Sequence, residues 1–291
     1  MFSKLKLIIT STIRQLIFSK FRHYAWPRRL HSRLLNFDNF YESLDAPLKH
    51  VNLGAGPYFV RKGWISADFL PDFKTNDSLV HIDLVKDPDN LPFTDLKCIY
   101  ASHLIEHFYY GIGTRVLKAA YNSLETGGYI RICVPDADLL INKVRENKFE
   151  YFRPIFSYYD IKGIKDYDIY DACMHLIAQS RSKYCIAQGS TEFLVNKNDC
   201  TDDFKNMLNN GRSNDEIISF LNNHSNPQDE SGSIHVCTYN SKLMIDTLKE
   251  AGFKDPYNSE FMKSDYGPLR EVPIFDGTHP WLTLYTEAVK I

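Results

Sequence analysis

The residues best suited to chemistry lie in the stretch YASHLIEHFYYG, residues 100–111, which contains His103, Glu106 and His107 in the spacing H-x-x-E-H. If this stretch is helical, side chains at positions i, i+3 and i+4 share one face, so two imidazoles and one carboxylate converge. Such a group can bind a divalent metal ion, and a histidine can also accept a proton at neutral pH. Which chemistry applies depends on how the surrounding strands and helices position these side chains.

Short apolar runs alternate with helical patterns from residue 49 onward. Strands are expected within HVNLGAG (50–56), WISADF (64–69), LVHIDL (79–84), KCIYAS (97–102), YIRICVP (129–135) and PWLTLYTEAVK (280–290). Helices are expected over residues 103–125, stopped by Gly127-Gly128, and over residues 240–253, capped by Gly252. Strands that alternate with helices predict an α/β fold with a mostly parallel sheet and helices on both faces.

The chain divides into an N-terminal segment, residues 1–47, and one domain, residues 48–291. Between about residues 137 and 234 the periodicity weakens and Tyr, Asn, Asp and Lys accumulate. We interpret this region as a cap-like insertion without a clear core of its own. Because it follows the fifth strand, we expect it above the carboxyl ends of the strands, where open α/β sheets bind ligands.

Composition and charge narrow the class of protein. Apolar residues make up 44% of the chain and charged residues 24%, values typical of a soluble globular protein. No apolar run reaches the roughly 18 residues of a membrane span, and none of the six cysteines forms a C-x-x-C pair, which favours reduced thiols in the cytoplasm.

The N-terminal segment is strongly basic. Residues 1–37 carry eight of the 34 basic residues and no acid, so the other 26 face 36 acidic residues. Apolar residues recur there at helical spacing, which predicts a basic amphipathic helix. Such a helix can pack on the domain, lie on an anionic membrane surface or act as a cleaved targeting peptide. The acidic remainder argues against a nucleic-acid partner.

A glycine turn follows the first expected strand. Gly54 and Gly56 allow a close backbone approach and positive φ angles, but a dinucleotide fingerprint would need a third glycine where Phe59 stands. Asp68 ends the second strand and Asp83 ends the third. Each of these signals is weak alone, and their order along the chain is more specific.

In that order the motifs resemble the class I S-adenosylmethionine-dependent methyltransferases. They are similar to predicted bacterial methyltransferases with the motifs N-L-G-C-G, G-W-x-N-x-D, L-P-F, S-H-x-L-E-H and P-G-G-x-x-R-I-x-V-P-D. The resemblance covers residues 50–140 and resumes at His235, LKEAGF and LYTEAVK. Ala55 in place of Cys and Thr126 in place of Pro depart from it. It implies a Rossmann-like, seven-stranded sheet and S-adenosyl-L-methionine as the methyl donor.

The resemblance also implies roles for individual residues. Gly54, Ala55 and Gly56 would face the methionine end of the cofactor, and Asp68 would hold the ribose diol. Asp83 would accept from the adenine amine, with Leu84 against the ring, and Ser102 would lie at the mouth of the fourth strand.

A zinc protease would need a zinc site between two helices and a further ligand, and the surrounding sequence offers neither. Three other interpretations of the H-x-x-E-H stretch remain. Glu106 and His107 could be structural, bonding to the glycine loop. His103 could be a general base for an attacking hydroxyl. His103, Glu106 and His107 could instead bind a divalent cation, similar to the E-x-x-E-H site of some O-methyltransferases, with His235 as a fourth ligand or second base.

The sequence therefore predicts a methyltransferase acting on a small-molecule, sugar or glycolipid hydroxyl. Relatives of this type often accompany polysaccharide-assembly genes, which favours a glycan or glycolipid acceptor. We expect a cytoplasmic protein, with the N-terminal segment as a peripheral contact to the inner face of a membrane. The alternatives are a nicotinamide-dependent oxidoreductase and a non-catalytic binding module of the same fold.

Overall fold

The structure is a computed structural model that describes residues 49–56, 59, 61, 63–69, 79–185, 194–196, 198–224, 234–271 and 274–291. The predicted basic helix and the rest of residues 1–47 lie outside this range. No helix in the described ranges combines the length and apolar character needed to cross a membrane.

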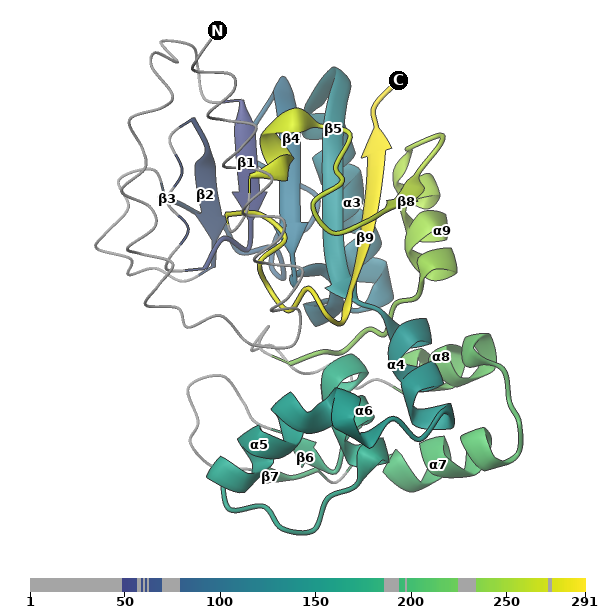
Figure 1. Ribbon diagram of the computed structural model, residues 1–291. Coiled ribbons are helices and arrows are strands. Elements are labelled where there is room, and N and C mark those ends of the chain that lie inside the picture. Colours follow the sequence, from purple (N-terminus) through teal and green to yellow (C-terminus); the bar gives the residue numbers. More distant parts are fainter. Residues whose placement is uncertain are drawn as a thin grey trace, which may run out of the picture.

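Seven strands of the described chain form the central sheet, in the order β3-β2-β1-β4-β5-β9-β8 (Figure 1). The first five are parallel to their neighbours: β1 (His50–Leu53), β2 (Ile65–Asp68), β3 (Leu79–His81), β4 (Leu96–Ser102) and β5 (Leu124–Pro135). The last two, β9 (Thr283–Val289) and β8 (Tyr257–Ser259), are antiparallel to their neighbours. The sheet confirms the predicted Rossmann-like, mostly parallel fold, and β8 is a short strand that the sequence pattern did not indicate.

Two helices, α3 (Tyr110–Ser123) and α9 (Ser241–Ala251), pack together on one face of the sheet (Figure 1). Their apolar sides join the main core, with Leu117 and Leu248 fully buried beside the strand residues. The Asn240 side chain accepts a hydrogen bond from the N–H of Leu243 and so caps α9, which ends at Gly252 in the left-handed region, as predicted.

The chain between β8 and β9 crosses the other face of the sheet (Figure 1) and contains the 3-10 helix η5 (Gly267–Arg270). A second buried cluster fills this interface, and its large members are Phe59, Trp64, Tyr100, Leu269, Phe275 and Tyr285. The fully buried Arg131 of β5 fixes the segment, because its guanidinium donates to Asp276 at 2.6 Å and to Glu287 of β9 at 2.7 Å. Removing either carboxylate would leave a buried charge without a partner, which strongly destabilises a folded protein.

The region after β5 forms a helical cap beyond the carboxyl ends of the parallel strands (Figure 1). It comprises α4 (Ala137–Arg145), η3 (Phe149–Phe152), α5 (Arg153–Ile161), α6 (Ile169–Ile177), η4 (Gln179–Arg181), β6 (Tyr184–Cys185), β7 (Leu194–Val195), α7 (Thr201–Asn209) and α8 (Asn214–Asn223). The expectation that this region lacks a clear core is wrong. Apolar residues of α4 through α8 form their own buried cluster, with Phe152, Tyr159 and Phe204 fully enclosed. Its helices are short, at nine or ten residues each, which weakens the apolar periodicity on which the expectation rested.

The predicted helix over residues 103–125 is also wrong at both ends. The chain leaves β4 with His103 at a φ of 52°, which an α-helix excludes, forms the 3-10 helix η2 (Ile105–His107) and begins α3 only at Tyr110. At the other end, Gly127 and Gly128 lie within β5. A Cβ on Gly128 would lie 2.8 Å from the carbonyl oxygen of Leu96, so this glycine serves the close pairing of β4 and β5.

Candidate active site

The glycine loop after β1 requires glycine for two physical reasons. Gly54 and Gly56 have φ angles of 66° and 64°, in the left-handed region that side chains disfavour. A Cβ on Gly54 would lie 2.8 Å from Cδ1 of Leu104, so the loop after β4 packs directly on the loop after β1. The N–H groups of Gly54 and Ala55 donate to the Ala67 carbonyl of β2, at 2.8 and 3.3 Å.

Asp68 links the second strand to this loop. The N–H of Gly56 donates to Oδ2 of Asp68 at 2.7 Å, so the carboxylate lies beside the loop at the carboxyl edge of the sheet. A carboxylate can accept several hydrogen bonds at once, so Asp68 can hold the loop and also accept from ribose hydroxyls. The structure thus brings together the glycine loop and the acid that the sequence singled out.

Asp83 holds its own turn after β3. Its Oδ1 accepts from the N–H groups of Val85 and Lys86, and Oδ2 lies 3.1 Å from the Lys86 ammonium. Burial alone would raise the pKa of Asp83, but these hydrogen bonds and the Lys86 charge hold it below its ordinary value. Leu84 next to it is buried in the main core. Their roles toward an adenine ring stay predictions.

The H-x-x-E-H stretch occupies the crossing between the sheet and the cap. The N–H of His103 donates to the Cys133 carbonyl of β5, which extends the pairing of Ser102 with Cys133. The carbonyl of Glu106 accepts from the N–H groups of Val236 and Cys237, at 2.9 and 3.0 Å. The chain that returns from the cap is therefore fastened to η2, and this contact carries His235 to the site.

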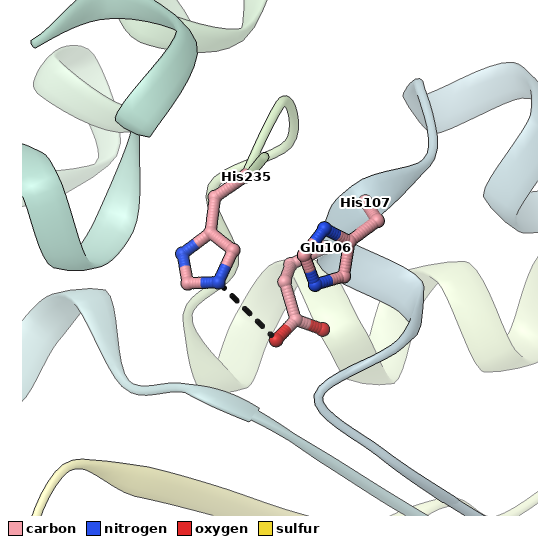
Figure 2. Close-up of side chains that lie close together, drawn as sticks. All are labelled: Glu106, His107 and His235. Atoms are coloured by element: carbon pink, nitrogen blue, oxygen red, sulfur yellow. Dashed lines mark ion pairs between the residues drawn. The ribbon is translucent and has the colours of Figure 1, made fainter. Parts of the chain in front are cut away.

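Glu106 is the centre of a buried group of charged and polar side chains. Its carboxylate is 1% exposed, and Oε1 lies 3.1 Å from Nδ1 of His103 and 3.8 Å from Nε2 of His235. The imidazole ring of His107 lies against that of His235, with ring centroids 5.0 Å apart, and Figure 2 shows the two rings on either side of the carboxylate.

The pKa values of Glu106 and His235 are both lowered in this group. Burial alone would raise the pKa of Glu106, but its interaction with His103 and the neighbouring imidazoles lower it to about 2. Burial and the nearby His107 lower the pKa of His235 to about 3. At neutral pH Glu106 is therefore ionised and His235 is neutral, which makes His235 a weak base.

His103 contacts two residues that the sequence did not suggest. Its Nε2 lies 2.9 Å from Oγ1 of Thr283 at the start of β9, and its ring meets that of the exposed His279 edge to face, at a centroid distance of 5.6 Å. Oγ1 of Thr283 also lies 2.8 Å from the carbonyl oxygen of His279. Both partners lie far along the chain, and no local pattern marks them.

No protein-family model matches the chain, and no curated protein matches it. Among solved structures, it is similar to a methyltransferase from Mesorhizobium loti, "S-adenosylmethionine dependent", with 13% identity, a TM-score of 0.39 and coverage of 84% of this chain and 93% of that one. A "SAM dependent methyltransferase from Archaeoglobus fulgidus" has 13% identity and a TM-score of 0.39, with 95% and 99% covered. A structure described as "PigF with SAH" has 9% identity and a TM-score of 0.38, with 83% of this chain and only half of that one covered. The fold follows from the strand order of the sheet.

Proposed function

We propose that the protein is an S-adenosylmethionine-dependent methyltransferase that transfers the methyl group to a hydroxyl of a small molecule, sugar or glycolipid. The observation that carries the proposal is the bond between Gly56 N–H and Asp68. It joins a glycine loop with two left-handed residues to a strand-end carboxylate, at the carboxyl edge of β1 and β2. This arrangement suits a nucleoside whose ribose bonds to an acid and whose other end lies against a bare backbone.

The same region disfavours a nicotinamide dinucleotide. A dinucleotide site places the pyrophosphate on the N-terminus of the helix that follows the glycine turn. Here residues 54–64 connect β1 to β2, and the described residues of this connection contain no helix. Phe59, at the third glycine position, is buried against Trp64 and Phe275. The strand beside β5 is antiparallel, so the second parallel half of a dinucleotide fold is also absent from the described sheet.

In this proposal, His103 is the general base. The sulfonium of the bound cofactor supplies an activated methyl group, so the protein must mainly orient the acceptor and remove its proton. If Nδ1–H of His103 donates to Glu106, Nε2 carries the lone pair that can take this proton. Glu106 then fixes the ring and stabilises the imidazolium that forms, as a carboxylate does beside a catalytic histidine.

The hydroxyl of Thr283 lies where we expect the acceptor hydroxyl to bind. Its Oγ1 lies 2.9 Å from Nε2 of His103, so its O–H can donate to the lone pair. The same O–H has a second acceptor in the His279 carbonyl, at 2.8 Å. When an acceptor hydroxyl donates to Nε2, the Thr283 hydroxyl can turn to that carbonyl without losing a hydrogen bond. Nε2 of His103 would then take the proton of the acceptor hydroxyl as the acceptor oxygen receives the methyl group.

The proposed acceptor class is tested with cofactor labelled in its methyl group. We expect label to enter neutral sugars or glycolipids as a methyl ether, which survives alkali. Release of the label as methanol in alkali would indicate a carboxyl ester instead. If no hydroxyl compound takes up label while an amine does, the proposal of O-methylation is wrong.

The basic N-terminal segment supports a lipid-linked acceptor. Eight basic residues without an acid should bind an anionic surface, each adding about 1 kcal/mol close to the membrane. Removing residues 1–36 should therefore reduce sedimentation with phosphatidylserine vesicles at low salt and leave cofactor binding unchanged. Equal sedimentation of both chains would refute membrane attachment through this segment.

A further inference from the structure

We infer that Glu106, His107 and His235 form a binding site for one divalent transition metal ion of the zinc type. One ligand atom from each residue lies within 4.8 Å of the other two. Of the four ligands that the sequence suggested, this set contains Glu106, His107 and His235 and leaves out His103. The inference concerns metal binding and does not depend on methyl transfer.

The hydrogen bonds of the two imidazoles prepare them as ligands. Nδ1 of His107 lies 3.0 Å from the Ile234 carbonyl, and Nδ1 of His235 lies 2.7 Å from the Leu176 carbonyl of α6. A carbonyl can only accept, so Nδ1 carries the hydrogen in both rings and a neutral ring keeps its lone pair on Nε2. Histidines that bind metals in proteins characteristically donate their other N–H to a carbonyl or carboxylate in this way.

Between His235 and Glu106, two hydrogen-bond acceptors face each other without a donor. Nε2 of His235 lies 3.8 Å from Oε1 of Glu106, which is too long for a hydrogen bond. Two lone pairs and a buried carboxylate that face one another repel unless a cation lies among them. Ligand atoms about 2.1 Å from one tetrahedral ion lie roughly 3.4 Å apart, so small side-chain shifts would complete the site.

The backbone holds the ligands in register. Glu106 and His107 belong to η2, and His235 is carried by the strand whose Val236 and Cys237 N–H groups donate to the Glu106 carbonyl. Two imidazole nitrogens and one carboxylate oxygen favour zinc, cobalt or nickel over magnesium or calcium, which prefer oxygen ligands. Three protein ligands leave a coordination position open. His103, the proposed base, lies outside the ligand set, and Glu106 would link it to the ion because Oε1 lies 3.1 Å from Nδ1 of His103.

The test uses the full chain, freed of metal with a chelator and then titrated with Co²⁺ or Zn²⁺ alone. We expect one equivalent of tightly bound metal after gel filtration, a Co²⁺ visible spectrum without thiolate bands, and a higher melting temperature with Zn²⁺. Glu106→Gln and His235→Gln should each weaken binding by at least about 100-fold, more than the loss of an outer-shell partner. Glu106→Gln keeps the side-chain volume, and its circular dichroism and melting in the absence of metal report whether it folds.

The matched control is His224→Gln on α8. Nδ1 of His224 also bonds to a backbone carbonyl, that of Phe220 at 2.8 Å, but this side chain is exposed and belongs to no metal-ligand group among the described residues. It should bind metal like the unaltered chain. The inference is overturned if the unaltered chain binds less than stoichiometric metal, if folded Glu106→Gln or His235→Gln binds as well as the control, or if the Co²⁺ spectrum shows cysteine ligands.

Discussion

His103 combines a strained backbone with an oriented side chain. A φ of 52° is uncommon outside glycine and persists where the surrounding structure enforces it, often at functional sites. Here the N–H is held by Cys133 and the ring lies between Glu106 and Thr283. The imidazole is thus fixed before any acceptor arrives, as a general base requires.

The role of His103 is tested with His103→Asn, because asparagine tolerates the left-handed backbone better than alanine. We expect turnover to fall by about 10²–10⁴-fold while affinity for S-adenosylhomocysteine stays nearly unchanged. His224→Asn, which alters an exposed histidine on α8, should retain full turnover. If folded His103→Asn keeps its activity with saturating acceptor, His103 is not the base.

Gly54 and Leu104 should be energetically coupled. Gly54→Ala places a Cβ 2.8 Å from Leu104 Cδ1 and also adopts a left-handed φ, so we expect roughly 2–4 kcal/mol of lost stability. Gly56→Ala shares the left-handed φ but meets no atom within 4 Å, and it should cost only about 1 kcal/mol. Chemical denaturation measures both.

The double variant Gly54→Ala/Leu104→Ala isolates the steric part. Removing the Leu104 side chain relieves the clash, so the double variant should be more stable than the sum of the single changes by at least about 1 kcal/mol. Strict additivity would mean that the two loops do not press on each other.

At this scale the sequence indicated that the glycine loop and Asp68 lie together, and it indicated the group around Glu106 only in part. Gly54, Gly56 and Asp68 lie at the ends of adjacent strands, so their spacing along the chain carries over to their spacing in the fold. The grouping of His235 and Thr283 with residues 103–107 depends on how the cap returns and how β9 is inserted. Neither of these features produces a periodic pattern in the local sequence.

Two helices of the cap begin at capping motifs that are local in the sequence. The helices of the cap pack around a core that contains several aromatic residues. Ser213 and Glu216 form a capping box at the start of α8, and Asp168 and Asp171 form one at the start of α6. These signals can be read from the sequence. The cap core could not be, because its apolar residues come from five short helices that meet only in three dimensions.

His175 in α6 should make the stability of the protein depend on pH. Burial lowers its pKa to about 4, although a hydrogen bond from its ring to the Tyr184 backbone carbonyl partly opposes this, and the ring packs edge to face on Tyr159. Between pH 6.5 and 4 the unfolded chain holds more protons on this residue than the folded chain does. Stability therefore falls as pH is lowered through this window, by roughly 3 kcal/mol in total.

The measurement compares the unfolding free energies of the unaltered chain and His175→Phe at several pH values. Phenylalanine keeps a ring against Tyr159 but does not titrate, so the difference between the two chains should shrink or reverse toward pH 4. The exposed His224→Phe should leave the pH profile unchanged. A parallel profile for His175→Phe would show that His175 is protonated to the same extent in the folded and unfolded chains.

At the scale of the whole molecule, the architecture of the sheet could be predicted only in part. The five parallel strands could be predicted from the alternation of strands and helices, and the resemblance to methyltransferases implied the full count of seven. The antiparallel insertion of β9 and the short β8 could not be derived from periodicity, because a strand's direction depends on the path of the connecting chain. Arg131, which appeared as one polar residue within a buried strand, proves to fasten the chain between β8 and β9 to the sheet.

The most direct test of the central claim is calorimetric titration of the full-length chain with S-adenosylhomocysteine and, separately, with NAD⁺. We expect one site for S-adenosylhomocysteine with a micromolar dissociation constant, about −8 kcal/mol, and no binding of NAD⁺. Asp68→Ala should weaken the first interaction by about 1.5–3 kcal/mol, the scale of a hydrogen bond to a charged group. Absence of S-adenosylhomocysteine binding by the folded, unaltered chain, or comparable binding of NAD⁺, would contradict the proposal.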